Sequence, residues 1–315
     1  MAGFVNALSA SFVLLLIMAV GYVMGHLGWL GTSEKRFLSK YLINIAVPCN
    51  CIVGVLNNLD RDDLAKVVTM LICALCTVTG AMLLSMVAAT LLRLPRKQWG
   101  VFVSMAGLSN VIFIGIPVCT QLFGEACMPH LMVYFLANSM FVQAVALMLI
   151  KRAGSNEVTR FSLGKFIKDL LSSPPIVSLF VALALMLLDV SLPSLVMKFA
   201  GYISDSLSPL ALIYCGFIIF EVGLKNIRLS RGLPTMLVIR LIIAPLICLG
   251  FCMVFGVTGL ARNVFLVESA LPVVTQVTVM AGTYGADDKY AATGACLSTL
   301  ASFITIPILM LLVGG

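Results

Sequence analysis

Apolar residues fall into ten runs of about 20 residues, separated by short polar stretches. The hydrocarbon core of a bilayer requires a helix of that length, so each run is expected to cross a membrane. The approximate limits of the runs are 8–27, 37–57, 66–92, 99–123, 129–150, 174–190, 203–223, 233–256, 262–284 and 290–312. The pattern predicts an all-α membrane protein with ten transmembrane helices.

The fourth run contains polar and helix-breaking residues near its middle. Ser109 and Asn110 are followed by Gly115 and Pro117. A proline removes a helical hydrogen bond, and a nearby glycine makes a break easier. Inside a bilayer, a break is tolerated only where it lines a polar cavity. We therefore expect the fourth helix to break at Gly115 and Pro117 and to line a binding site.

The ninth run has the same character. Pro272 lies near its middle, and its polar residues include Glu268, Thr275 and Gln276. Two broken helices are expected to meet at mid-membrane and to form one site. Because the N-terminus of a half-helix carries partial positive charge and unpaired N–H groups, the expected ligand is a small organic anion.

A constant shift of 161 residues relates the two halves of the chain. It carries Tyr41 onto Tyr202 and Gly124 onto Gly285. Five helices in each half would make the second half enter the membrane from the opposite face, which gives an inverted repeat. The expected organisation is a first repeat over 1–150, a cytoplasmic linker over 151–173 and a second repeat over 174–315.

Composition supports a membrane protein and argues against other classes. Hydrophobic residues make up 61% of the chain and charged residues 10%, with a mean hydropathy of +1.11, whereas soluble domains are about 25% charged. The net charge of +7 comes from short basic loops, so no nucleic-acid partner is expected. The first run lacks a basic segment before it and a cleavage site, which indicates a retained helix. Most of the ten cysteines lie in apolar runs as small buried hydrophobes.

Basic residues divide unevenly between alternate loops. One side of the membrane is expected to hold Lys35, Arg36, Lys40, Arg93, Arg96, Lys97, Lys151, Arg152, Arg160, Lys165, Lys168, Lys225, Arg228, Arg231 and Lys289. The other side holds Arg61, Lys66, Lys198 and Arg262. Positive residues stay cytoplasmic, so both termini of this multi-pass protein of the cell membrane are expected to be extracellular or periplasmic.

Two polar residues at membrane depth are the main candidates for chemistry. Asn110 is costly in hydrocarbon unless its amide is hydrogen-bonded, and we interpret it as a ligand contact; the alternative is a bond between helices to a neighbour such as Asn138. Glu268 is expected to bind a coupling cation or carry a proton, or else to form an ion pair with Arg262. Arg240 is expected to reach the interface or to pair with Glu221, with a transport role as the alternative.

Other polar side chains are placed near the same region by the repeat. The full set of expected substrate-binding residues is Ser109, Asn110, Gly115, Pro117, Asn138, Pro272, Thr275, Gln276, Asn44 and Tyr214. Ser139, Ser298 and Thr299 face the same region, although such hydroxyls more often bond their own helix. The sequence has no catalytic Ser/His/Asp spacing, no phosphate-binding loop and no paired carboxylates, so no enzymatic activity is expected.

The motifs resemble those of the auxin efflux carrier family of permeases. They are Asn110 with Ile114-Gly115-Ile116-Pro117, Pro272, Tyr290-Ala-Ala-Thr and Leu297-Ser-Thr-Leu. The family is similar in fold to bile acid/sodium symporters and sodium/proton antiporters. The resemblance implies two inverted five-helix repeats, broken helices 4 and 9 that cross, and an elevator-like motion of a core against a scaffold. Asn110 would touch the substrate at a crossing made by Pro117 and Pro272.

The function implied is a secondary active transporter of small organic anions. The short linker is typical of a bacterial permease for mono- or dicarboxylates rather than of a plant auxin exporter. Similarity to the bile acid symporters implies coupling to sodium beside protons, and the expected ion-coupling residues are Glu268, Ser109, Asn110, Gln276 and Ser139. The alternatives are a sodium-coupled symporter of the bile acid type, a non-transporting receptor or a channel. No cofactor is expected besides a coupling Na⁺ or H⁺, and a homodimer would form through scaffold helices.

Overall fold

The structure is a computed structural model that describes residues 2–59, 64–155, 162–223 and 229–313. Within these ranges the chain forms helices joined by short loops, and no element is a β-strand. The all-α prediction is therefore confirmed for the described residues. Four basic residues used to predict the orientation lie outside them: Arg61, Arg160, Lys225 and Arg228.

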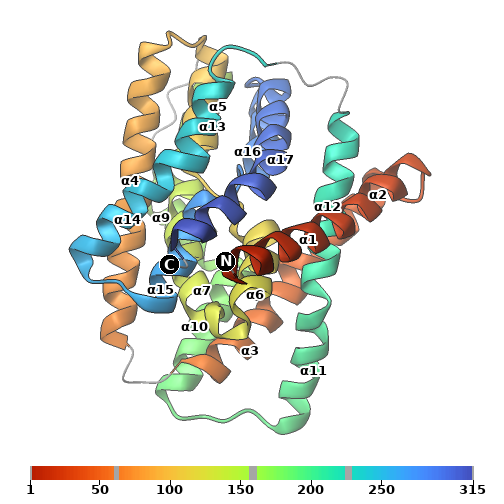
Figure 1. Ribbon diagram of the computed structural model, residues 1–315, viewed down its shortest axis with the longest axis vertical. Coiled ribbons are helices and arrows are strands. Elements are labelled where there is room, and N and C mark those ends of the chain that lie inside the picture. The colour runs from red at the N-terminus through yellow and green to blue at the C-terminus, as the bar shows by residue number, and fades with distance from the viewer. Residues whose placement is uncertain (1, 60–63, 156–161, 224–228, 314–315) are drawn as a thin grey trace.

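The elements of the first half begin near the N-terminus and end before residue 156 (Figure 1). They are α1 (Ala2–His26), α2 (Thr32–Tyr41), η1 (Leu42–Ala46), α3 (Val47–Asn58), α4 (Leu64–Leu91), α5 (Arg96–Gly107), η3 (Val111–Gly115), α6 (Ile116–Phe123), η4 (Glu125–Cys127), α7 (Met128–Phe141), η5 (Val142–Ala146) and α8 (Leu147–Gly154). Those of the second half are α9 (Leu163–Leu171), α10 (Pro174–Leu187), α11 (Ser194–Asp205), α12 (Leu207–Val222), α13 (Leu233–Val238), η7 (Ile239–Ile243), α14 (Ala244–Phe255), α15 (Gly259–Ala270), α16 (Gln276–Tyr284) and α17 (Asp288–Val313).

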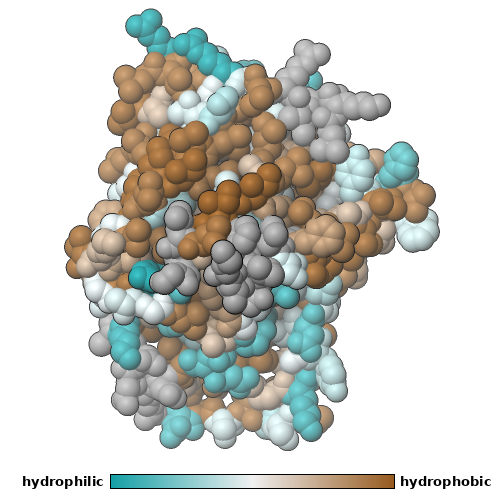
Figure 2. All heavy atoms as spheres, viewed as in Figure 1, coloured by the Kyte–Doolittle hydropathy of each residue, from teal (hydrophilic) through white to brown (hydrophobic). Residues whose placement is uncertain are grey.

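Six helical segments of the described chain are long and apolar enough to cross a membrane. They are Thr32–Asn58, Lys66–Leu91, Glu125–Gly154, Ser194–Val222, Leu233–Phe255 and Asp288–Leu311. Shorter apolar helices cover Phe12–His26, Val111–Phe123 and Pro174–Leu187. Apolar residues cover most of the middle of the visible face, and polar residues gather mainly toward the two ends of its long axis (Figure 2). The chain is thus a multi-pass membrane protein, while the count of ten spans stays a prediction.

Helices from the two halves of the chain are interleaved. Helix α1 packs along α12 and α17, and α4 packs against α14 as well as α5 and α7. Helix α3 lies between α10, α11 and α7. In Figure 1, α16 and α17 lie together near the end of the molecule that also holds the start of α5. Neither half therefore forms a separate globule.

Glycines allow α1 and α12 to approach closely. A methyl group at Gly216 would lie 1.9 Å from the carbonyl oxygen of Met18, and one at Gly21 would lie 2.0 Å from that of Ile213. Small residues at such contacts let membrane helices pack backbone to backbone. Any side chain at either position must push the two helices apart.

Gly216→Ala is therefore expected to destabilise the protein by about 1–3 kcal/mol, the usual cost of overpacking a tight contact. The measurement is the melting temperature of the purified protein in detergent. Gly201→Ala in α11 is the matched control, because a methyl group there meets no atom within 4 Å. Equal melting temperatures for the two variants would contradict the close packing of α1 on α12.

Prolines explain most of the π-helical segments, in which the helical turn is wider than in an α-helix. Of the four π-helical segments in the described ranges, η1, η3 and η7 each end two residues before a proline, at Pro48, Pro117 and Pro245. A proline has no N–H and its ring crowds the carbonyl one turn earlier, and a wider turn relieves that clash. These three helices therefore continue through their prolines.

Two helices are interrupted, and only one break lies where the sequence predicts it. Helix α15 ends at Ala270 and α16 begins at Gln276, which confirms the break around Pro272. The prediction of a break at Gly115 and Pro117 is wrong, since both residues are helical. The chain is instead unwound at 108–110, between α5 and η3.

Candidate functional site

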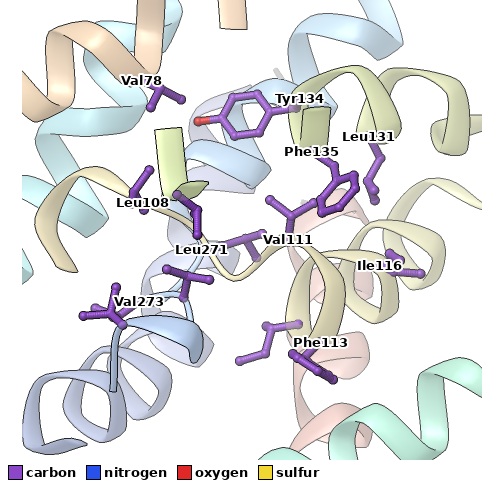
Figure 3. Packing of buried hydrophobic residues seen from close by; sticks show 14 of the residues in the cluster. Val78, Leu108, Val111, Phe113, Ile116, Leu131, Tyr134, Phe135, Leu271 and Val273 are labelled. Carbon is purple, nitrogen blue, oxygen red and sulfur yellow. The ribbon is translucent and has the colours of Figure 1, made fainter. Parts of the chain in front are cut away.

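The two unwound segments lie against each other in the middle of the molecule. The N–H of Asn110 donates to the carbonyl oxygen of Pro272 at 2.9 Å, and the N–H of Val274 donates to that of Leu108 at 3.4 Å. In Figure 3 the two stretches of non-helical backbone pass each other beside Leu108 and Val273. Each break therefore supplies hydrogen bonds for backbone groups of the other, which an interruption inside a bilayer requires.

One polar side chain from a neighbouring helix holds each break. The amide of Asn138 on α7 accepts from the N–H of Ser109 and donates to its carbonyl oxygen, both at 3.0 Å. The hydroxyl of Ser298 on α17 accepts from the N–H of Val273, also at 3.0 Å. Asn138, expected to contact substrate, thus has both ends of its amide engaged with the backbone of Ser109.

Asn110 and Thr275 join the two breaks through their side chains. The amide nitrogen of Asn110 donates to the hydroxyl of Thr275 at 3.1 Å. The bond between helices is therefore to Thr275 and not to Asn138. Both residues lie at the wall of a cavity of about 800 Å³. An asparagine amide has a second N–H and a carbonyl oxygen, so this pair has polar capacity left for a ligand.

The two unwound segments, 108–110 and 271–275, together form the crossing. The cavity extends from this crossing to charged residues between α12, α16 and α17. Its polar lining consists of Lys35, Asn110, Tyr214, Glu221, Thr275, Thr278, Asp288, Lys289, Thr293 and Thr299. Lys35 forms an ion pair with Glu221. Tyr214 is 4% exposed, and its ring stacks on Phe113 with centroids 4.8 Å apart. The volume is within the range of small-molecule sites, which is about 300–1,000 Å³.

A second, smaller cavity of about 50 Å³ also reaches Asn110 and Thr275. Ser109, Asn138, Ser139 and Gln276 line it, and Gln276 is exposed. Several residues expected to bind substrate or a coupling ion therefore lie around the crossing together.

Asn44 lies apart from the crossing. Its side chain is exposed, and its amide donates to the carbonyl oxygen of Lys40 in the same helix at 2.7 Å. Asn50, six residues further on, is buried and donates to the hydroxyl of Ser204. The polar patch of this helix therefore serves helix contacts, and nothing in the structure brings Asn44 to the site.

Glu268 is enclosed behind the crossing. It is 0% exposed, and its Oε1 accepts from the thiol of Cys119 at 3.3 Å. A methyl group at Gly115 would lie 2.7 Å from the same oxygen. Gly115 is thus needed because the carboxyl group packs on its backbone, and not because it breaks the helix. Pro117 is buried next to it in α6.

The expected ion pairs of this region are wrong. Arg262 donates to the side-chain oxygen of Asn263 at 3.2 Å rather than to Glu268. Glu221 pairs with Lys35, so it is not the partner of Arg240. Arg240 is 1% exposed and donates to the hydroxyl of Ser109, which excludes an interfacial position. Its place inside an apolar run was the only sequence signal for this contact.

The described residues contain no group of three or more His, Cys, Asp or Glu side chains arranged to hold a metal ion. The polar groups at the crossing are amides, hydroxyls and backbone atoms, with one enclosed acid and one enclosed guanidinium. Such groups suit reversible binding of a small polar molecule.

Comparisons with known proteins agree with this picture. A family model described as membrane transport protein matches residues 7–310. An uncharacterized transporter of Methanocaldococcus jannaschii is 23% identical over 301 residues, which cover 93% of this chain and 94% of that protein. An uncharacterized transporter of Methanothermobacter thermautotrophicus is 26% identical over 302 residues, with 93% and 94% covered. The matched residues include both breaks and every residue of the crossing.

Proposed function

The chain belongs to the membrane transport protein family, and we propose that it is a secondary carrier of small organic anions such as mono- or dicarboxylates. Membership agrees with the resemblance to auxin efflux carriers and makes the protein a transporter rather than an enzyme. One observation carries the choice of site: the bonded pair Asn110 and Thr275 joins two unwound segments at the wall of a cavity of about 800 Å³.

Helix polarity supports an anion as the cargo. Both η3 and α16 begin directly after an unwound segment, and their first residues line the smaller cavity. The first turn of a helix presents N–H groups without intrahelical partners and a partial positive charge. Asn110 adds a side-chain donor between these two ends. A carboxylate is the small group that matches this set of donors.

The repeat supports a ten-span, inverted organisation with alternating access. A side chain from α7 holds the first break, and a side chain from α17 holds the second. These matching roles agree with a first repeat over 1–150 and a second over 174–315. In this proposal the crossing moves with the core as an elevator, while the remaining helices serve as the scaffold.

The charged rim of the cavity supports an inward-facing state. Lys35 and Lys289 lie at its wall, and both belong to the lysine-rich side of the chain. Because basic loops stay cytoplasmic, the cavity opens toward the cytoplasm and the termini lie on the opposite side.

Counterflow in proteoliposomes tests the function. Vesicles loaded with an unlabelled dicarboxylate are expected to accumulate the labelled compound several-fold faster than empty vesicles, since a carrier returns faster when loaded. A thermal-shift panel of small mono- and dicarboxylates selects the compound, because a ligand at 100 times its Kd stabilises the folded state by about 2.7 kcal/mol. Protein-free vesicles are the control. Flux that internal substrate fails to accelerate would indicate a channel and overturn the proposal.

A further inference from the structure

A single guanidinium links the two broken helices from behind. Arg240 lies in η7, and its Nη2 donates to the hydroxyl of Ser109 at 2.8 Å and to the carbonyl oxygen of Ser269. Ser109 belongs to the first unwound segment, and Ser269 lies in the last turn of α15, directly before the second. With 1% of its surface exposed, Arg240 contacts the crossing without reaching the aqueous cavity.

A buried acid directly precedes Ser269, whose carbonyl oxygen accepts from this guanidinium, and it has no ion pair among the described residues. The acid is Glu268, which is fully buried and makes no direct ion pair with Arg240, so the two opposite charges attract each other over a longer distance. Its Oε2 makes no hydrogen bond, and neither do Nε and Nη1 of Arg240. Enclosed charges require compensation, because each is costly to remove from water. Here the compensation comes from within the chain.

The oxygen atoms around Arg240 are those that a transported or coupling cation uses. In carriers with broken helices, unwound backbone carbonyls and the C-terminal ends of half-helices coordinate the ion. Ser269 supplies a carbonyl oxygen at the C-terminal end of α15, where the helix dipole is negative, and Ser109 supplies a hydroxyl oxygen. Glu268 adds a buried carboxyl group near this set, without a direct ion pair to the guanidinium.

We propose that Arg240 is a resident cation of the crossing, which holds Ser109 and Ser269 and offsets the charge of the nearby Glu268 in the place of a coupling sodium ion, and which makes this protein independent of sodium. The role of this cation in transport rests on the proposed function, but its contacts with Ser109 and Ser269 do not. Arg240 acts as a positioning residue, because its contacts fix the two unwound segments and it does not touch the cavity.

The first test compares sodium with choline. The purified full-length protein is melted in NaCl and in choline chloride at equal ionic strength, without substrate. The expected difference in melting temperature is below about 1 °C, because the guanidinium already occupies the oxygen atoms. An ion bound at 100 times its Kd would raise the melting temperature by about 5 °C, and such a rise would overturn the proposal.

The second test is a double-mutant cycle on Arg240→Met and Glu268→Gln. Each single change leaves one buried group without its charge partner, and each is expected to lower the melting temperature by about 10 °C. The double variant removes both charges. Its melting temperature is therefore expected to fall by much less than the sum of the two single losses. Arg36→Met is the matched control, because Arg36 is exposed on α2 and should change little. Additive losses would overturn the pairing.

If Arg240→Met does not fold, the double variant decides the matter: a folded double variant supports the pairing, and an unfolded one contradicts it. Both tests use protein without substrate, so their failure leaves the anion carrier intact. Conversely, absent counterflow together with indifference to sodium would remove the proposed cargo and leave the resident cation standing.

Discussion

Asn110→Ala is expected to weaken anion binding by about 10- to 100-fold, so that uptake is lost at substrate concentrations near the Kd of the unaltered protein. A hydrogen bond to a charged group contributes about 1.5–3 kcal/mol, and every 1.4 kcal/mol is tenfold in affinity. Asn110 is 3% exposed, joins Thr275 across the two breaks and lies at the wall of both cavities. Among the residues of the crossing, Asn110 is therefore expected to contact the substrate most directly.

The measurement is uptake of the labelled anion into proteoliposomes, with the melting temperature as a check on folding. Asn58→Ala is the matched control, because the amide of Asn58 donates only to the carbonyl oxygen of Gly54 in its own helix. We expect the control to transport like the unaltered protein. Normal uptake by Asn110→Ala, or an equal loss in both variants, would remove Asn110 from the site.

Asn138→Ala is expected to cause the largest loss of stability among the single changes discussed here outside the Arg240 pair. Its amide satisfies both the N–H and the carbonyl oxygen of Ser109, a residue with 0% exposure. An unsatisfied buried polar group costs about 1–3 kcal/mol, so two of them cost about 2–6 kcal/mol. The melting temperature should fall accordingly.

Ser298→Ala provides the internal comparison. It removes one hydrogen bond, from the N–H of Val273, and should cost about half as much. Thermal melts of both variants in the same detergent give the ratio. A melting temperature for Asn138→Ala equal to that of the unaltered protein would show that the first break does not need this support.

The two breaks show which helix interruptions the local sequence predicts correctly and which it does not. Pro272 lies within an unwound segment as predicted, whereas Pro117 stays within a helix. The difference arises because η3 widens to accommodate Pro117, so that the N–H of Gly115 bonds to the carbonyl oxygen of Asn110 at 3.0 Å. A proline pattern predicts strain in a helix, but the surrounding contacts decide whether the helix widens or breaks.

The partners of the two buried charged residues were even less predictable from the sequence. Arg240 and Glu268 are recognisable in the sequence because they lie within apolar runs, and both were expected to need partners. Their partners were not predictable, since Ser109 precedes Arg240 by 131 residues and Cys119 precedes Glu268 by 149. The sequence offered Arg262, six residues from Glu268 in the same run, as one partner, and Glu221 as a candidate partner of Arg240; the structure has neither pair.

The sequence alone determined that the chain is helical, apolar and membrane-embedded, and that its polar centre lies near Asn110 and Pro272. Those properties follow from hydropathy and helix-breaking residues, which act over a few turns of one helix. The tertiary structure decided which residues meet: the backbone bonds between the two breaks, the support from Asn138 and Ser298, and the guanidinium behind the crossing. Inside a membrane every polar group must find a partner within the protein, and packing between distant helices selects that partner.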